Sequence, residues 1–261
     1  MDILERIVAQ KKIEVQQKRE MLPFHVLEQY PHYAHETVSL HEVLARGSST
    51  GIITEFKRRS PSKGVINDQV EIVDVVNDYE AHGAAGISVL TDEQFFGGFL
   101  DDLMVAREAV SCPILRKDFI VDEYQVVEAK AIGADVILLI AACLSQAAVK
   151  RLAALAMSLG LEVLLELHDE EEIGHICDDT SLIGINNRNL KTFEVDIDRS
   201  LRMAEMIPED KIKIAESGIS SAANIKLFKK YGFSGFLIGE NFMKEPNPGE
   251  AFKRFVQQLG D

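Results

Sequence analysis

Short apolar runs alternate with longer amphipathic stretches from Gly51 to the end of the chain. The runs are rich in Val, Ile and Leu and recur roughly every 20 to 30 residues, which predicts β-strands separated by helices. The eight runs are IITEFK from Ile52, GISVLT from Gly86, PILRKDF from Pro113, DVILLIA from Asp135, LEVLLEL from Leu161, LIGINNR from Leu182, KIKIAES from Lys211 and GFLIGE from Gly235.

Apolar residues at helical spacing fill the intervals, most clearly over residues 68–82, 122–132, 145–158, 220–231 and 249–259. Nearly continuous apolar strands joined by helices indicate a parallel sheet covered by helices, and eight such units can close into a (βα)8 TIM barrel. The alternative is an open doubly wound sheet, which would place a glycine-rich turn after the first strand. The turn here reads KRRSPSKG and has no GxGxxG. We therefore predict an α/β fold of the TIM-barrel type.

The first 50 residues differ from the repeating part of the chain. Apolar residues at helical spacing predict an amphipathic helix over residues 3–20, and Pro23 and Pro31 interrupt that pattern. A second short helix is expected between Ser39, a suitable N-cap, and Gly47, a suitable C-terminal glycine. We expect one domain over residues 1–261, with a helical extension over 1–50 and the barrel over 51–261.

Charge and composition narrow the range of partners. The chain has 28 Lys and Arg against 42 Asp and Glu, a net charge of −14, which disfavours nucleic acid and anionic membrane surfaces. A small anionic substrate remains compatible, because a local cluster of cations can focus a positive field. Three well-separated cysteines and the lack of an apolar leader or of a run of about 18 apolar residues predict a cytoplasmic protein without disulfides. A monomer is expected, with a homodimer as the alternative.

Polar residues stand where most of the predicted strands end: Glu55 and Lys57, Lys117 and Asp118, Glu166 and His168, Asn186 and Arg188, Glu216 and Ser217. Barrel enzymes build their sites at the carboxyl ends of the strands, so these side chains are expected to meet at one mouth. Any single charge could be a solvated pair at the rim. Acids and bases converging from separate strands favour catalysis, because burying them together costs desolvation that pairing or a ligand must offset.

A second pattern points to phosphate. Ser217 and Gly218 precede a predicted helix, and Gly239 and Glu240 lie in the last loop. Glycine allows backbone N–H groups to approach an oxyanion, and a helix N-terminus adds a positive dipole. Ordinary glycine turns are the alternative interpretation.

The strand-one segment TEFKRRSPSKG closely resembles the signature of indole-3-glycerol-phosphate synthases, with Glu55, Lys57, Ser60 and Pro61 at the characteristic positions. The resemblance extends over most of the chain, helical extension included. Its further segments are SVLTDEQFFGG from Ser88, PILRKDFIVDEYQ from Pro113, LLELH from Leu164, GINNRNL from Gly184, AESGI from Ala215 and LIGENFM from Leu237.

The resemblance implies ring closure, decarboxylation and dehydration of 1-(2-carboxyphenylamino)-1-deoxyribulose 5-phosphate, without a cofactor or metal. The substrate-binding residues would then be Ser60, Pro61, Ser217, Gly218, Gly239 and Glu240 around the phosphate, Arg188 with Lys57 and Asn186 on the benzoate carboxylate, and Phe96 and Phe119 against the aromatic ring. For both phenylalanines, plain core packing is an equal alternative.

The same resemblance implies the catalytic roles. Lys117 would be the general acid at the carbonyl oxygen, and Glu166 the base that takes the proton of the ring nitrogen when hydroxide leaves. Lys57 is a candidate acid for that hydroxide. Glu55 and Glu216 would orient the lysines and hold their charge, and Asn186 is counted with them among the catalytic residues.

Other functions fit the residues less well. His32, His35 and His41 lie in the irregular extension without acid or cysteine partners, so no metal site is expected. A phosphosugar isomerase of the same barrel type would share the phosphate site but would need an enediol acid and base pair. A non-catalytic scaffold would not need the polar strand ends. Indole fluorescence distinguishes these alternatives, because the chain contains no tryptophan.

Overall fold

A computed structural model of the chain describes residues 3–47, 49–189 and 194–260. Its parallel strands close into a barrel in the order β1-β10-β9-β8-β7-β6-β5-β4, which confirms the predicted fold. The strands are β1 (Ile52–Phe56), β4 (Gly86–Leu90), β5 (Ile114–Lys117), β6 (Val136–Ile140), β7 (Glu162–Leu167), β8 (Leu182–Asn186), β9 (Ile212–Glu216) and β10 (Phe233–Ile238). Each predicted run coincides with one strand, although β10 begins two residues before the run from Gly235.

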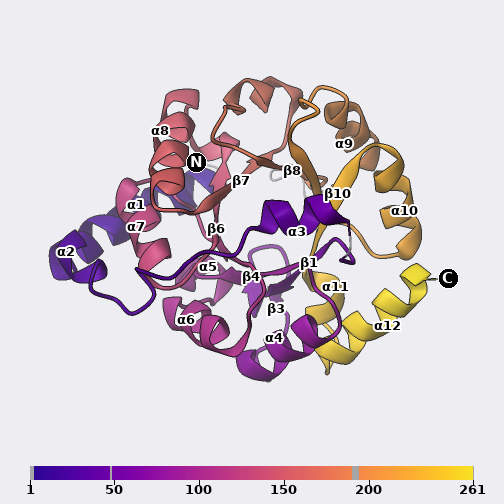
Figure 1. Cartoon of the computed structure of the whole chain (residues 1–261), viewed down its shortest axis with the longest axis horizontal. Coiled ribbons are helices and arrows are strands. Elements are labelled where there is room, and N and C mark those ends of the chain that lie inside the picture. The colour runs from indigo at the N-terminus through magenta and orange to yellow at the C-terminus, as the bar shows by residue number, and fades with distance from the viewer. Residues whose placement is uncertain (1–2, 48, 190–193, 261) are drawn as a thin grey trace.

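Helices surround the barrel, as Figure 1 shows. They are α4 (Ile72–Ala81), α6 (Leu100–Ala109), α7 (Glu123–Ala131), α8 (Gln146–Ser158), α9 (Ile197–Ala204), α10 (Ala222–Lys230) and α12 (Pro248–Gly260). After β7 the connection is a 3₁₀-helix, η2 (Glu170–His175). The sequence pattern did not locate α6, because this helix buries Asp102 and Arg107 and so breaks the apolar period. It also missed α9, which has only eight residues.

Alternating strand residues supply two apolar layers. One set points into the barrel and includes Ile53, Leu115 and Leu164, while the other set packs against the outer helices. Helix α3 (Leu40–Arg46) runs across the barrel in Figure 1 and contributes Leu40 and Leu44 to the interior layer. As predicted, Ser39 caps α3 and Gly47 ends it with φ of 63°. This helix leaves the carboxyl ends of the strands as the open mouth.

Helix α1 (Ile3–Met21) confirms the predicted amphipathic helix, but its buried face differs from a simple apolar stripe. Ile13 is 53% exposed, whereas Lys11 is buried. The Lys11 ammonium lies 2.9 Å from Asp92 and 3.1 Å from Asp118. These ion pairs fix α1 to the residues that follow β4 and β5. A short helix, α2 (Phe24–Leu27), continues the extension.

Small elements follow several strands at the mouth and were not predicted. They are the hairpin β2 (Arg59–Ser60) and β3 (Gly64–Val65), α5 (Glu93–Phe96), η1 (Ala141–Cys143) and α11 (Glu240–Met243). Within residues 3–47, 49–189 and 194–260, no helix is long and apolar enough to cross a membrane.

Leu190, the last residue of the segment GINNRNL, lies outside the described residues.

Candidate active site

A cavity of about 470 Å³ opens at the carboxyl ends of the barrel strands. Its volume is typical of a small-molecule site. The structure brings all the predicted site residues to its wall: Glu55, Lys57, Ser60, Pro61, Phe96, Lys117, Phe119, Glu166, Asn186, Arg188, Glu216, Ser217, Gly218, Gly239 and Glu240.

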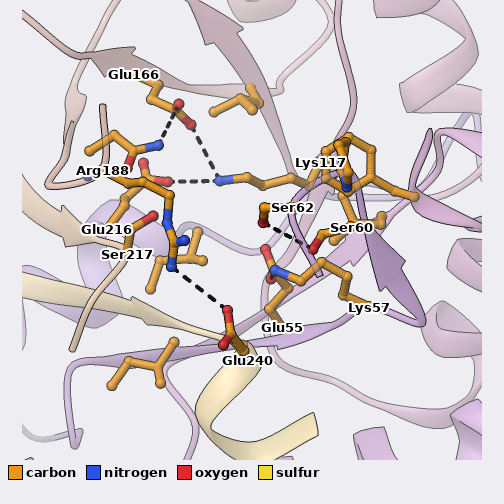
Figure 2. Close-up of a pocket in the computed structure, with 18 of the residues that line it drawn as sticks. Glu55, Lys57, Ser60, Ser62, Lys117, Glu166, Arg188, Glu216, Ser217 and Glu240 are labelled. Carbon is orange, nitrogen blue, oxygen red and sulfur yellow. Dashed lines mark hydrogen bonds and ion pairs between the residues drawn. The ribbon is translucent and has the colours of Figure 1, made fainter. Parts of the chain in front are cut away.

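Lys117 lies at the centre of the charged groups (Figure 2). Its ammonium donates hydrogen bonds to Glu216 Oε2 at 2.7 Å and to Glu166 Oε2 at 3.3 Å. Asn186 Nδ2 donates to the other oxygen of Glu166 at 3.0 Å. Because Lys117, Glu166, Asn186 and Glu216 come from β5, β7, β8 and β9, the barrel itself sets their spacing.

The two carboxyl groups that share Lys117 have different electrostatic environments. Burial raises the pKa of Glu216, and the nearby Glu166 adds to this, so that despite Lys117 the pKa is about 7. Burial acts in the same direction on Glu166, but Lys117, His168 and Asn186 outweigh it and hold the pKa of Glu166 well below its usual range. Two acids with separated pKa values are typical of an acid–base site.

The pKa of Lys117 is raised. Burial alone would lower it, but the negative charges of Glu216, Glu166 and Glu55 outweigh that effect. Lys117 is therefore protonated at neutral pH and can donate a proton.

Lys57, which directly follows β1, forms an ion pair with Glu55. Two of the acids that hold a lysine, Glu55 and Glu216, depend on a glycine in or just after the adjacent strand. A Cβ atom at Gly239 would lie 2.2 Å from Glu55 Oε1, and one at Gly184 would lie 2.1 Å from Glu216 Oε1. The glycines of LIGEN and GINNR thus make room for Glu55 and Glu216.

Arg188 lines the same cavity as Lys117 and is half-buried. Its guanidinium lies 3.7 Å from Glu240 Oε2, and Lys63 lies 3.6 Å from Glu240 Oε1. Because the ion pair with Glu240 is long, the Arg188 guanidinium can still bind an added carboxylate. The Glu240 side chain is already paired with Arg188 and Lys63.

The residues predicted to bind phosphate lie together. Ser217 and Gly218 precede a helix as predicted, but α10 starts only at Ala222, with Ser221 as its N-cap, so they do not lie directly at its end. They form a turn with φ of 66° and 69°, and the Ser217 carbonyl accepts a hydrogen bond from Asn187 Nδ2 at 2.7 Å. Any oxyanion there would therefore meet turn N–H groups rather than the end of α10. Ser60 reaches the cavity from the β2–β3 hairpin.

An apolar side of the cavity completes the site. The rings of Phe96 and Phe119 lie 5.9 Å apart between centroids. Sequence reasoning missed Ile3, Leu4 and Ile7 of α1, which also line the cavity. No sequence motif marks these three residues. Their position on the face of α1 that the Lys11 ion pairs turn inward is the one signal that could have indicated that they line the cavity.

A closed parallel barrel whose mouth gathers buried acids, lysines and an arginine in one cavity defines an acid–base enzyme of the (βα)8-barrel class. A sequence model of the indole-3-glycerol phosphate synthase family matches residues 4–255. The chain belongs to that family.

Individual relatives agree with this assignment. An indole-3-glycerol phosphate synthase of Bacteroides thetaiotaomicron is 47% identical over 258 residues and covers 99% of each chain. One of Polaromonas is 45% identical over 254 residues and covers 96% of each chain. Among solved structures, the tryptophan synthase A-subunit of Pyrococcus furiosus superposes with a TM-score of 0.61 at 17% identity, over 81% of this chain and 98% of that one. At that identity the likeness shows the shared fold alone.

Proposed function

We propose that this cavity converts 1-(2-carboxyphenylamino)-1-deoxyribulose 5-phosphate to indole-3-glycerol phosphate. The observation that carries the proposal is Lys117 held between Glu216 and Glu166, with a second lysine and Arg188 in the same cavity. The substrate has two anionic ends, a benzoate and a phosphate. The benzoate carboxylate would lie against Arg188, Lys57 and Asn186, and the phosphate against the turn at Ser217 and Gly218.

Ring closure joins the aryl carbon that bears the carboxylate to the ketone carbon, and the ketone oxygen takes a proton from Lys117. Cleavage of the bond to CO2 then returns an electron pair to the ring and restores its aromaticity, so no cofactor is needed as an electron sink. Lys57 protonates the departing hydroxyl group, and Glu166 accepts a proton.

The balance of atoms identifies the last proton. It leaves the methylene carbon beside the ketone carbon, rather than the ring nitrogen, because the indole keeps one hydrogen on nitrogen. Two lysines donate a proton each and Glu166 receives one, so each turnover takes one proton from solvent. This uptake matches the loss of a carboxylate as neutral CO2.

The direct test is indole fluorescence from the purified chain and this substrate, with CO2 measured in parallel. The protein background is low because the chain has no tryptophan. One CO2 per indole is expected. An enzyme that isomerises the substrate and releases no CO2 would contradict the proposal.

Arg188→Ala is expected to raise KM by about tenfold or more with a smaller loss of kcat, because a hydrogen bond between charged groups contributes about 1.5 to 3 kcal/mol to binding. Steady-state fluorescence assays measure both constants. Arg202→Ala, on the exposed side of α9, is the matched control and should match the wild type. A substrate analogue without the benzoate carboxylate should be indifferent to Arg188→Ala. Equal losses of affinity for the substrate and for the analogue would exclude Arg188 as the residue that binds the benzoate carboxylate.

Inorganic phosphate is expected to bind at the mouth without substrate, about 2.7 to 3.2 Å from backbone nitrogens of both residues 217–220 and residues 239–241, where α11 begins. Gly218 is a poor site for a variant, since an added Cβ would lie 2.5 Å from Val195 Cγ1. Ser60→Ala should instead weaken phosphate binding about three- to tenfold through one lost hydrogen bond, as measured by calorimetry. Ser158→Ala at the far end of α8 is the control. Unchanged affinity in Ser60→Ala would remove that hydroxyl from the phosphate site.

A further inference from the structure

His168 is a buried ionisable residue that the proposed chemistry does not use. It directly follows β7 and is 5% exposed. Glu166 and His168 are two residues apart, so both side chains lie on the same side of the strand end. Glu166 lines the cavity but His168 does not. His168 therefore lies behind the carboxylate of Glu166 as seen from the substrate.

The contact between these residues is close. His168 Nε2 lies 3.0 Å from Glu166 Oε1, the oxygen that also accepts from Asn186 Nδ2. The other oxygen, Oε2, faces Lys117 at 3.3 Å. One edge of the carboxylate is thus held by His168 and Asn186, and the other edge remains toward Lys117 and the cavity.

A second acid holds His168 from the opposite side. Glu172 Oε2 accepts a hydrogen bond from the His168 backbone N–H at 2.6 Å and lies 3.7 Å from His168 Nδ1. Glu172 also completes the capping box at Asp169, where η2 begins. The imidazole ring therefore lies between two carboxylates, one facing substrate and one fixed by the turn.

We propose that His168 is the positioning residue of Glu166: it holds the carboxylate by Oε1, keeps it ionised and leaves Oε2 to accept the proton during the final step. The inference rests on the proposed function, in which Glu166 is the base. His168 does not touch substrate, so it acts only through Glu166.

The charges around the pair support this role. Burial would lower the pKa of His168, but its contacts with Glu166 and Glu172 outweigh that and raise the pKa to about 10. The groups that face Glu166 are Lys117 from β5, Asn186 from β8, Glu216 from β9 and His168 itself. Removing the His168 charge leaves Lys117 as the only cation among them, so the pKa of Glu166 rises.

The kinetic test uses two substitutions. His168→Leu should lower kcat by about tenfold or more while KM changes by less than about threefold, because the base is misplaced but binding groups remain. It should also raise the pKa of the Glu166 carboxyl group by about one unit or more, since an opposite charge beside a carboxylate is lost. The ¹³C shift of that carboxyl carbon, titrated in the free protein, measures this pKa. His168→Asn can still donate to Oε1, so it should recover much of kcat and keep the raised pKa of Glu166.

His175→Asn is the matched control. His175 is in the same turn, but its ring nitrogens contact the backbone carbonyls of Glu172 and Leu144. This variant is expected to lose stability without changing the pKa of Glu166. An unchanged Glu166 pKa in both His168 variants, or the same rise in His175→Asn, would overturn the inference.

A measurement without turnover separates this inference from the proposed function. In the wild type, ¹⁵N NMR of the His168 ring should show both nitrogens protonated at pH 8, and in Glu166→Gln the pKa of the ring should fall. An unchanged pKa of the His168 ring in Glu166→Gln would overturn the inference even if the wild type forms indole. Conversely, if this pKa falls in Glu166→Gln but the wild type forms no indole, the proposed function is removed and the His168–Glu166 pair remains. If His168→Leu fails to fold, His168→Asn and the NMR titration still decide.

Discussion

Replacing Lys117 by methionine is expected to lower kcat by about 100-fold or more, the usual cost of losing a general acid. The chain should still fold. Removing this cation leaves Glu166 and Glu216 as two buried like charges, but a buried carboxyl group responds by a raised pKa and takes up a proton. Single-turnover experiments should show neither CO2 release nor indole fluorescence, because Lys117 acts in the first step.

Two controls separate catalysis from stability in that experiment. Lys253→Met makes the same change on α12, where the ammonium pairs with Glu250 at the surface, and should leave kcat unchanged. Adding Glu216→Gln to Lys117→Met removes one of the unpaired acids and should restore thermal stability but not turnover. If Lys117→Met keeps activity within about threefold of the wild type, Lys117 is not the acid.

The fold followed from the sequence because its determinants are local. Most strands are apolar runs bordered by Gly, Pro or charged residues, and eight such runs alternating with helices are compatible with few other folds. Lys117, Glu166 and Asn186 could be placed at one mouth because parallel strands in a closed barrel all end on the same side. These side chains lie close together because of the barrel topology, and the pattern of strands in the sequence determines that topology.

Contacts between distant segments could not be predicted in the same way. The ion pairs of Lys11 with Asp92 and Asp118 join α1 to the barrel across more than 80 residues, and no periodicity encodes them. The space that Gly184 leaves for Glu216 depends on the register of β8 against β9. His168 was placed at a strand end, but its partner Glu172 belongs to a turn whose capping geometry only the structure shows.

Glu166→Gln is expected to lower the rate of indole formation by about 100-fold or more, since an amide cannot accept the last proton. Its defect should differ in kind from that of Lys117→Met. Ring closure and decarboxylation precede the step that needs the base, so one equivalent of CO2 per site should appear at nearly the wild-type rate. The hydroxyindoline formed at that point should persist without indole fluorescence.

Quenched-flow measurement of ¹³CO2 beside stopped-flow fluorescence resolves the two events in Glu166→Gln. The glutamine has nearly the shape of the glutamate and can still accept a hydrogen bond from Asn186 or Lys117, so a binding defect is not expected to confuse the result. Glu170→Gln in the exposed part of η2 provides the control and should release CO2 and form indole together. Loss of CO2 release together with fluorescence in Glu166→Gln would place Glu166 before decarboxylation, where its charge would serve to hold Lys117 protonated. Normal rates of both would leave the base to another residue of the cavity, and Glu55 beside Lys57 would then be the next carboxylate to replace.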